Sequence, residues 1–519
     1  MIKWGINIVC LLLLVSCQFK VPKDPYTLTY PIPADPDTLN PIITADGNQR
    51  IINDFIYEQL VRIDRETAKA VPSLAEKWDV SKDKLQIIFF LRKNAIWHDG
   101  VPFTAEDVLY SYEQIQNPEV DAAPQRSDLV NVSRLEALDP YTVRFTFKRP
   151  DYKGINAVGA MRLVPKHIYN DGNKFNSHPA NRFPIGTGPY KFAAWITGRK
   201  ILIERNDAYW GLKPDIGKIE FKIVTDSNVQ FQILKKGELD VGIMRPIQMV
   251  KQADTPKFNE RFNKYEYYLP LCFFIGWNAQ KPYFEEASVR KALTHLINRE
   301  GINEKLYFGK AKGLATCFDV NSPEYDETIK PYPYNPEAAK KLLSGAGWID
   351  HDNDGVLDKG GFPFNFTFSM IGGDAATSRI ATMIREDLLK AGIVMEIRQF
   401  EWATFLNQIS KRDFDAVWLA WAFNPTSDPY EIWHSSQIES GSNFVGFKKE
   451  EMDRLLVEGQ SEFDEAKRKE IYSRAQQILH EEEPYTAMYA PASLVAIDKR
   501  FENVKVHTLG IDPREWRVK

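Results

Sequence analysis

A short acidic loop carries carboxylates at a spacing that suits a hard cation. They stand at positions one, three, five and nine of the twelve-residue calcium-loop pattern, at Asp350, Asp352, Asp354 and Asp358. Gly355 supplies the glycine of position six, but position twelve is Gly361 and not a bidentate carboxylate. The loop therefore predicts either a structural calcium site completed by other ligands or a solvated Asp/Gly turn. No other cofactor is expected.

The N-terminus combines an export signal with a cysteine suited to acylation. An uncharged apolar run over residues 8–15 follows Lys3 and is too short to span a bilayer, as in a signal peptide. The run ends in Leu14-Val15-Ser16-Cys17, which resembles the lipobox of bacterial lipoproteins. We expect residues 1–16 to be the signal peptide and residues 17–29 a tether held by several acyl chains on Cys17. The alternative is a plain secretory signal.

Two further cysteines could form a disulfide. Cys10 would leave with the signal peptide and Cys17 would be acylated, so Cys272 and Cys317 remain to pair in an oxidising compartment. Sequence does not give their distance in space, so a bridge and two free thiols both stay open. The absence of a CxxC pair or a Cys/His cluster argues against zinc.

Common catalytic signatures are missing. The chain has no GxSxG, no HExxH and no phosphate-binding Gly-rich loop, and its eight histidines show no repeated ligand spacing. The run Glu481-Glu482-Glu483 could hold a catalytic carboxylate, but a charge run at a helix end is usually a solvated face. An exported hydrolase is therefore the weaker alternative, and we expect a protein that is not an enzyme.

Length and charge set broader limits. At 519 residues the chain is several times the usual domain size, so two or three packed units are expected. Its 66 basic and 70 acidic residues give a formal charge of -4 without a long block of like charge. This balance argues against a nucleic-acid partner.

Apolar spacing predicts a mixed α/β body. Residues 85–92 and 141–148 follow strand patterns, the second with alternating apolar and polar side chains. Between them, Thr104 and the acid three residues later form a variant of the capping box that predicts a helix start. Amphipathic spacing predicts helices around residues 289–297 and 471–479.

Residues 362–421 predict a strand–helix–strand–helix–strand unit. Apolar residues alternate at its start, a helix follows and ends at Gly392, and a short helix around Trp402 precedes the third strand. Such a unit implies parallel pairing with right-handed crossovers. Ligands of open α/β sheets bind beyond the carboxyl ends of the strands, so the loop after Trp421 is a candidate site.

Short segments along the chain carry a family resemblance. In order they are Asp37-Thr38-Leu39-Asn40-Pro41, Ala75-Glu76-Lys77-Trp78, Trp97–Val108, Gly186-Thr187-Gly188-Pro189-Tyr190, Asn206-Asp207-Ala208-Tyr209-Trp210, Gly237-Glu238-Leu239-Asp240, Val289-Arg290-Lys291-Ala292-Leu293 and Asp428-Pro429. Together they resemble the extracellular solute-binding proteins of family 5, the dipeptide, oligopeptide and nickel receptors of bacterial ABC transporters.

The resemblance implies a two-lobed periplasmic-binding-protein-like fold of type II with an extra inserted subdomain. It places a discontinuous lobe I at residues 30–65, 181–267 and 489–519. It places the inserted subdomain at residues 66–180 and lobe II at residues 268–488. A ligand that bridges both lobes only in the closed state would shift the equilibrium toward closure.

The resemblance also points to ligand-binding residues on the loop after the third strand. Family members that bind peptides place an aspartate shortly after a tryptophan there, where it pairs with the peptide's α-ammonium. Asn424 stands at that position, and a neutral amide makes a weaker contact than a carboxylate. Asp428 could substitute, although its Asp-Pro step also fits the family's turn.

Aromatic residues and expected lobe crossings complete the candidate set. Trp402 and Trp421 match aromatic positions that flank peptide side chains in oligopeptide binders, although tryptophan is mostly buried in any fold. Tyr190, Trp277 and Asn278 lie near the expected lobe crossings and are assigned as hinge or pocket residues.

The function that the resemblance implies is peptide capture outside the cytoplasmic membrane and delivery to an ABC permease with its ATPase subunits. We expect a monomer in the periplasm or at the cell surface, lipid-anchored to a bacterial membrane. Within the binding class, a nickel chelate, haem or an oligosaccharide are the alternatives, because an aromatic content of 13% suits sugars as well as peptide side chains. A sensory role also stays open.

Overall fold

The computed structural model describes residues 24–43, 47–424 and 427–519. Cys17 and the predicted signal peptide therefore lie outside the described residues. Helices and strands are mixed throughout, which confirms the predicted α/β class. Within the described ranges, no helix has both the length and the apolar character needed to cross a membrane.

The names lobe I, inserted subdomain and lobe II are kept for the ranges that the resemblance implies. Lobe I is built on a four-stranded sheet in the order β1-β10-β9-β8. The strands are β1 (Thr27–Ile32), β8 (Tyr190–Ile196), β9 (Lys200–Arg205) and β10 (Lys218–Ile223), and α1 (Gly47–Ile56) contributes to the same core. The first strand begins inside the predicted tether of residues 17–29. Leu28 and Ile32 are fully buried in β1, so residues 27–29 belong to the lobe and the tether ends earlier than predicted.

The inserted subdomain carries its own antiparallel sheet. Its order is β4 (Ala75–Val80), β5 (Gln86–Leu91), β7 (Thr142–Phe147) and β6 (Val132–Asp139), which confirms both strand predictions in this region. The helix α2 (Ala105–Gln116) starts after Thr104, whose backbone N–H donates to the Asp107 carboxylate at 3.0 Å, as the capping box predicts. Subdomain and lobe I share one continuous hydrophobic core, so the two form one body.

An eight-stranded sheet runs from lobe I into lobe II. Its central strand, β20 (Tyr485–Asp498), pairs first with β13 (Leu271–Trp277) and β14 (Ala311–Gly313), then with β12 (Phe262–Tyr268) and β11 (Val241–Met244). The predicted boundary between residues 488 and 489 falls inside β20, and the one between 267 and 268 falls at the end of β12. Both lobes thus share one ladder of hydrogen bonds.

Lobe II contains the predicted parallel unit. It consists of β17 (Asn365–Ile371), α11 (Ala375–Leu389), β18 (Val394–Phe400), α12 (Trp402–Ser410) and β19 (Ala416–Ala422). β17 pairs in parallel with both β18 and β19, which confirms the predicted topology. The two faces of this sheet have separate cores, because successive side chains of each strand point to opposite faces.

Helices cover both faces of the lobe II sheet. One face packs against α8 (Ala287–Leu296), α10 (Pro336–Gly345) and α11. The other packs against α12, α13 (Pro429–Trp433), α14 (Glu450–Ser461) and α15 (Glu465–Glu482). The predicted helices around residues 289–297 and 471–479 are confirmed as α8 and α15.

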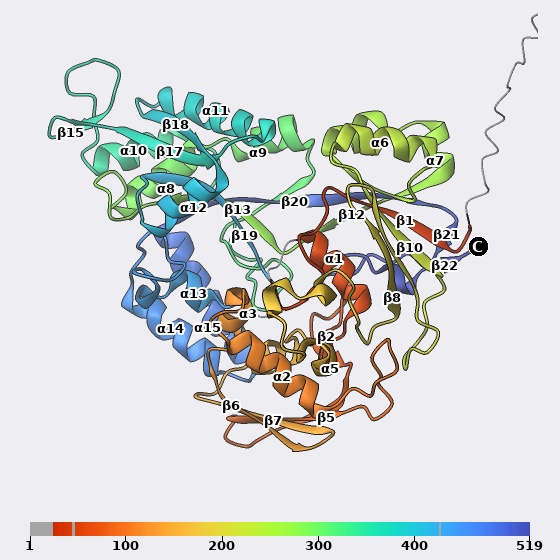
Figure 1. Ribbon diagram of the computed structural model, residues 1–519. Coiled ribbons are helices and arrows are strands. Elements are labelled where there is room, and N and C mark those ends of the chain that lie inside the picture. Colours follow the sequence, from red (N-terminus) through yellow and green to blue (C-terminus); the bar gives the residue numbers. More distant parts are fainter. Residues whose placement is uncertain (1–23, 44–46, 425–426) are drawn as a thin grey trace, which may run out of the picture.

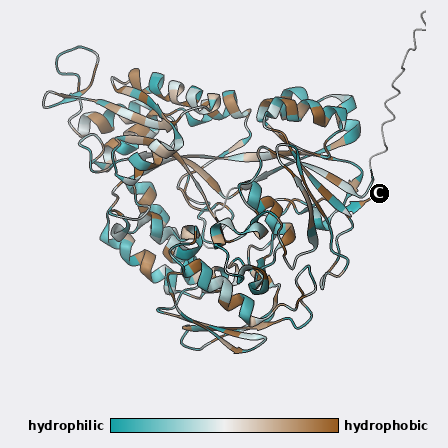
Figure 2. Cartoon of the chain, in the orientation of Figure 1, coloured by the Kyte–Doolittle hydropathy of each residue, from teal (hydrophilic) through white to brown (hydrophobic). Residues whose placement is uncertain are grey.

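Short elements connect these units, and Figure 1 shows α10 and α11 at the upper left, α6 and α7 at the upper right and β5–β7 at the bottom. Hydrophobic and hydrophilic residues are interleaved along the helices and strands of every unit (Figure 2). The short elements are β2 (Val61–Ile63), β3 (Ala70–Pro72), α3 (Ala123–Asp128), α4 (Gly154–Gly159), α5 (Lys166–Tyr169), α6 (Ser227–Lys236), α7 (Pro256–Arg261), α9 (Arg299–Ile302), β15 (Asp358–Lys359), β16 (Phe362–Pro363), β21 (Phe501–Glu502) and β22 (Arg517–Val518).

Candidate ligand-binding site

Two adjoining cavities lie beside the loop that follows β19. The first, which we name the arginine cavity, has a volume of about 380 Å³ and is lined mainly by residues of α1, by residues 57–65 and by residues 157–162. The second, the interlobe cavity, has a volume of about 340 Å³ and takes its walls from the subdomain and from lobe II. Asn424 and Leu509 line both cavities, so the two are neighbours.

The wall of the arginine cavity carries an excess of positive charge. Among its described lining residues, three carry carboxylates, Asp54, Glu58 and Asp128, and five carry guanidinium groups, Arg50, Arg62, Arg65, Arg162 and Arg514. Five guanidinium groups against three carboxylates give this wall a net positive charge. The chain thus presents donors for planar, negatively charged groups at this place.

Three of the five arginines are already engaged. Arg162 Nη1 lies 3.1 Å from Asp54 Oδ1. Arg65 and Arg514 share Asp512, with contacts of 3.3 and 2.6 Å to its Oδ2. Although burial opposes it, the charges of Arg514 and Arg65 hold the pKa of Asp512 well below its usual range. These three guanidinium groups therefore serve mainly to hold the wall together.

Arg50 on α1 and Arg62 on β2 are different. Both side chains are exposed, and neither makes an ion pair with any residue that the structure describes. A guanidinium offers up to five N–H donors in a planar fork. These two residues are therefore the groups of the cavity that can bind an anionic ligand without breaking an existing pair.

The position of α1 is fixed by close backbone packing. A side chain at Gly186 would bring its Cβ to 1.9 Å from the Ile56 carbonyl oxygen, so only glycine fits there. The N–H of Gly188 donates to the same carbonyl at 2.8 Å. Next along the chain, Glu58 accepts from the Tyr209 hydroxyl at 2.7 Å and the Trp210 Nε1 at 2.9 Å. Burial raises the pKa of Glu58, and these hydrogen bonds oppose that rise.

Charges in the interlobe cavity are largely paired. Its described lining holds three cations and three carboxylates. Lys69 of the subdomain side pairs with Glu465 of lobe II at 2.8 Å. Arg468 pairs with Glu324 at 2.8 Å, with both side chains about nine-tenths buried. These pairs use two of the cations and two of the carboxylates.

Asp319 is the remaining carboxylate of the interlobe cavity. It accepts the backbone N–H of Asn321 at 2.9 Å and makes no ion pair within the described part of the chain. Burial raises the pKa of Asp319, while the Asn321 hydrogen bond and the charge of Lys153 oppose that rise. The Lys153 ammonium itself donates to the carbonyl of Ser427. Asp319 is thus a half-buried carboxylate whose charge no cation contacts directly.

Direct contacts join the subdomain to lobe II across the interlobe cavity. The backbone N–H of Tyr152 donates to the Gln460 carbonyl at 3.0 Å. The guanidinium of Arg468 lies 4.0 Å from the centre of the Tyr152 ring, a cation–π contact. With the Lys69–Glu465 pair, these contacts hold the two walls of the cavity together.

The candidate residues Asn424, Asp428 and Trp402 differ in whether they line the cavities. Asn424 lines both cavities. Asp428 lines neither; it caps α13 by accepting from the Tyr430 N–H at 2.9 Å and also accepts from Gln460 Nε2 at 2.5 Å. Trp402 is 52% exposed at the start of α12 and lines neither cavity.

The other candidates lie in packing cores. Trp421 stacks on the rings of Phe274 and Phe444, with centroid distances of 6.1 and 5.8 Å, and lines neither cavity. The three residues assigned to the hinge or pocket are fully buried and hydrogen-bonded within their lobes: Tyr190 to Ile216, Trp277 to Thr486 and Asn278 to Phe414. None of the three lines either cavity, and buried side chains with satisfied polar atoms are typical of a core. Their assignment as hinge residues stays a prediction.

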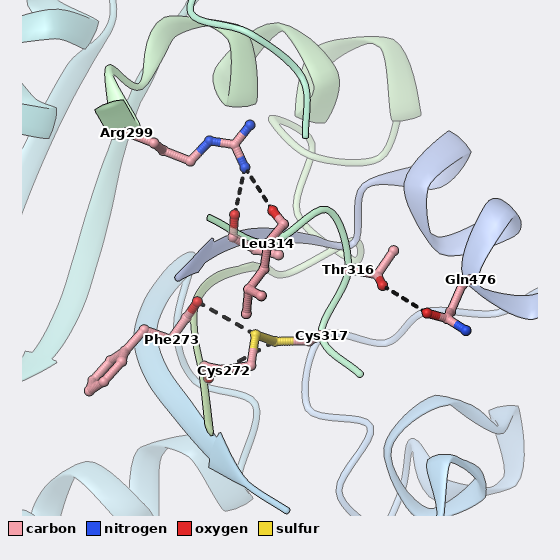
Figure 3. Close-up of a disulfide and its surroundings, with 8 residues drawn as sticks. Cys272, Phe273, Arg299, Leu314, Thr316, Cys317 and Gln476 are labelled. Atoms are coloured by element: carbon pink, nitrogen blue, oxygen red, sulfur yellow. Dashed lines mark hydrogen bonds between the residues drawn. A yellow bond between two sulfur atoms is a disulfide. The ribbon is translucent and has the colours of Figure 1, made fainter. Parts of the chain in front are cut away.

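Cys272 and Cys317 form a disulfide (Figure 3). Their Cα atoms lie 5.6 Å apart, and 45 positions separate them in the sequence. Cys272 belongs to β13, whereas Cys317 lines the interlobe cavity two residues before Asp319. The bridge therefore ties the segment that carries Asp319 to the lobe II sheet.

The acidic loop brings three of its four predicted ligands together. Carboxylate oxygens of Asp350, Asp352 and Asp354 lie within 4.8 Å of one another. Asp358 instead accepts the backbone N–H of His351 at 3.0 Å and contacts the ring Nδ1 of His351 at 3.0 Å. Calcium binding at this loop stays a prediction.

Calcium should raise the midpoint of thermal unfolding if the three clustered carboxylates form a site. At a free concentration 100 times the Kd, a ligand that binds only the folded state stabilises it by about 2.7 kcal/mol. Differential scanning calorimetry with CaCl₂, and with MgCl₂ for comparison, measures this shift. We expect Asp352→Asn to remove the shift and Asp79→Asn, an exposed carboxylate on β4, to leave it intact. An unchanged midpoint for the wild-type protein would rule the site out.

Sequence reasoning missed the charged residues of both cavities. Arg50, Arg62 and Asp319 stand in segments far apart in the sequence, and none belongs to a recognisable motif. Their grouping depends on how lobe I, the subdomain and lobe II meet. No linear signal could have identified them.

Comparisons with known proteins agree with this architecture. The family model described as bacterial extracellular solute-binding proteins, family 5 Middle, matches residues 69–443 of this chain. The oligopeptide-binding protein AppA of Bacillus subtilis is 30% identical over 484 residues, which cover 90% of this chain and 87% of that protein. The dipeptide-binding protein of Escherichia coli is 26% identical over 549 residues, covering 99% of this chain and 96% of its own.

A solved structure supports the same family assignment. The structure of Bacillus subtilis AppA in complex with a nonapeptide superposes with a TM-score of 0.80 at 28% identity, covering 95% of this chain and 99% of that one. The family match extends over more than half of the described chain and includes the β19 loop up to residue 443. The chain therefore belongs to the bacterial extracellular solute-binding proteins of family 5.

Proposed function

We propose that this protein is the substrate-binding component of an ABC transporter and that it captures peptides outside the cytoplasmic membrane. The observation that carries the proposal is the pair of adjoining cavities between lobe I, the subdomain and lobe II, lined by both unpaired charges and apolar side chains. Cavities of this size are typical of small-molecule sites. The names of the relatives, an oligopeptide-binding and a dipeptide-binding protein, support peptides as the solute.

Capture would work through lobe closure. Residues of the subdomain and of lobe II face each other across the interlobe cavity, so a ligand there contacts both only when the lobes are together. The Tyr152–Gln460 hydrogen bond and the Lys69–Glu465 pair join the same two parts of the chain and would form only when the lobes are together. A ligand that adds contacts in this state shifts the equilibrium toward it.

Delivery would take place at a membrane. Acylated Cys17 would anchor the protein there, and the lipobox-like sequence Leu14-Val15-Ser16-Cys17 supports this step. The closed protein would then dock as a monomer on a permease whose ATPase subunits supply the energy. In this scheme the protein binds its solute without chemical turnover.

The peptide assignment predicts what the purified protein retains and what stabilises it. Denaturing the protein should release a mixture of short peptides that mass spectrometry identifies. Adding a tetrapeptide library to the ligand-free protein should raise the midpoint of thermal unfolding, with about 2.7 kcal/mol of stabilisation at 100 times the Kd.

Other released compounds would distinguish the alternatives. A single nickel chelate, haem or oligosaccharide, with no response to tetrapeptides, would overturn the peptide assignment and leave the family membership intact. Shorter fragments accumulating from an added peptide would indicate a hydrolase and contradict binding without turnover.

A further inference from the structure

The unpaired charges of the two cavities have opposite signs. The interlobe cavity contains one carboxylate that makes no ion pair within the described chain, Asp319, whereas the arginine cavity contains Arg50 and Arg62. We propose that a bound peptide lies with its α-ammonium beside Asp319 and its C-terminal carboxylate beside Arg50 and Arg62. This orientation rests on the proposed function, because a peptide carries an ammonium at one end and a carboxylate at the other.

Asp319 meets the requirements for an ammonium site. It is half-buried, so its charge is poorly solvated, and the hydrogen bond that it accepts comes from the backbone N–H of Asn321 in its own turn. A partly buried charge without a counterion is costly, and a ligand ammonium would relieve that cost. Lys153, whose charge acts on Asp319, already donates to the Ser427 carbonyl. The other two carboxylates of the cavity are held in ion pairs.

Arg50 and Arg62 meet the requirements for a carboxylate site. The remaining arginines of the cavity are held by Asp54 and Asp512, so a new anion would bind at the two unpaired guanidinium groups first. Guanidinium and carboxylate groups match in a bidentate geometry. One turn along α1 from Arg50, the side-chain oxygen of Asn53 is buried and has no hydrogen-bond partner in the described chain. It can accept an N–H from the peptide backbone.

The junction between the cavities is consistent with a peptide backbone crossing it. Asn424 lines both cavities, and its amide can donate to and accept from peptide groups. An α-ammonium bound at Asp319 needs no second carboxylate at position 424. The departure from aspartate at this position therefore follows from the proposed orientation, because the amine is recognised from the Cys317–Glu324 segment instead of the β19 loop.

The test pairs modified peptides with matched variants. Binding is measured by equilibrium dialysis and mass spectrometry with a tetrapeptide library in three forms: free termini, N-acetylated and C-amidated. For the wild-type protein we expect each modification to weaken binding roughly 10-fold, the usual effect of losing a charge-assisted contact.

Each variant should abolish the effect of only one of the two modifications on binding. In Asp319→Asn, free peptides should bind roughly 10-fold more weakly, N-acetylation should have no further effect, and C-amidation should keep its full effect. In the double variant Arg50→Gln/Arg62→Gln, free peptides should likewise bind roughly 10-fold more weakly. C-amidation should then have no further effect, and N-acetylation should keep its full effect. The control variants Asp79→Asn and Arg385→Gln replace exposed side chains that line neither cavity, and both should behave like the wild-type protein. Because each variant keeps one intact response, loss of folding is distinguished from loss of a contact.

Several outcomes would overturn the orientation. Additive losses, in which N-acetylation still weakens binding to Asp319→Asn, would show that the ammonium lies elsewhere. Loss of the C-amidation effect in Asp319→Asn would show that the two ends are not recognised independently at the two cavities, which contradicts the orientation. The protein could instead bind C-amidated peptides as well as free ones and select peptides with acidic side chains. That result would show that the C-terminal carboxylate is not the group bound by Arg50 and Arg62. If no form of the library binds any variant or the wild-type protein, the proposed function fails and not the orientation alone.

Discussion

Breaking the Cys272–Cys317 disulfide is expected to lower the free energy of unfolding by about 4 kcal/mol. The bridge joins residues 45 positions apart, and a cross-link over that distance removes much of the conformational freedom of the unfolded chain. Both cysteines are buried, so the folded state can keep its packing when the bond is absent. The loss should therefore come chiefly from the greater entropy of the unfolded state.

Urea unfolding with and without a reductant measures this effect. The midpoint for the wild-type protein should fall in reductant, whereas the midpoint of Cys272→Ala/Cys317→Ala should not change with reductant. The double alanine variant provides the control for side-chain volume, since reduced wild type keeps both sulfur atoms. Equal midpoints for the oxidised and reduced wild-type protein would contradict the prediction.

The same reduction should weaken ligand binding at one end. Cys317 lies two residues before Asp319, so the bridge restrains the segment that would hold the peptide ammonium. A less restrained segment must lose more freedom on binding. We therefore expect reduction to diminish the difference between free and N-acetylated peptides and to leave the effect of C-amidation unchanged.

Local sequence patterns predicted most of the fold. The alternation in residues 141–148 gave β7, and the capping box at Thr104 gave the start of α2, because both depend on neighbours in the sequence. The parallel unit from β17 to β19 followed from the order of elements and the handedness of crossovers. The extent of β20 could not be predicted in this way, since a strand shared by two lobes has partners from both.

The cavities could not be read from local patterns. Trp421 stands on the loop side of β19, yet Phe274 and Phe444 cover its ring, and neither neighbour is identifiable from the sequence around it. Arg50 and Asp319 come together with Asn424 only after the lobes have docked. Sequence thus indicated, through Asn424, the edge of the sheet beside which both cavities lie, whereas the charges opposite that edge required the tertiary structure.

Acidification is expected to destabilise the protein through His98. Its Nδ1 accepts the N–H of Gly186 at 3.1 Å, so the ring proton is on Nε2, which donates to the Gly188 carbonyl at 3.0 Å. Burial lowers the pKa of His98 to about 4, and the nearby charge of Lys191 adds to this effect. A second ring proton would remove the acceptor that Gly186 uses. The folded protein therefore holds this histidine in its neutral form.

The sign of the pH dependence follows from the two pKa values. In the unfolded chain His98 has a pKa near the ordinary value of 6.5, whereas in the folded protein it is about 4. Between these pH values the unfolded chain binds a proton that the folded protein does not. Stability is thus full above pH 6.5 and falls as the pH drops toward 4, by about 3 kcal/mol in total at 1.36 kcal/mol per pH unit.

Urea unfolding of the wild-type protein and His98→Gln at pH 7 and pH 4.5 isolates this contribution. The wild-type protein should lose more stability than the variant between the two values. His507→Gln serves as a control of opposite sign, because hydrogen bonds to Glu515 and Glu66 raise the pKa of His507. Its stabilising contribution is present below the unfolded pKa and is lost as the pH rises through the folded value. Parallel losses in the wild-type protein and His98→Gln would contradict the role of His98.

The location of His98 gives this titration a structural consequence. It joins the Trp97–Gly100 turn of the subdomain to Gly186 and Gly188, and Gly188 in turn donates to the end of α1. Arg50 lies on that helix. If protonation loosens this junction, acid pH should weaken recognition of the carboxylate end of the ligand. C-amidation should therefore matter less at pH 4.5 than at pH 7 in the wild-type protein, and His98→Gln should show no such change.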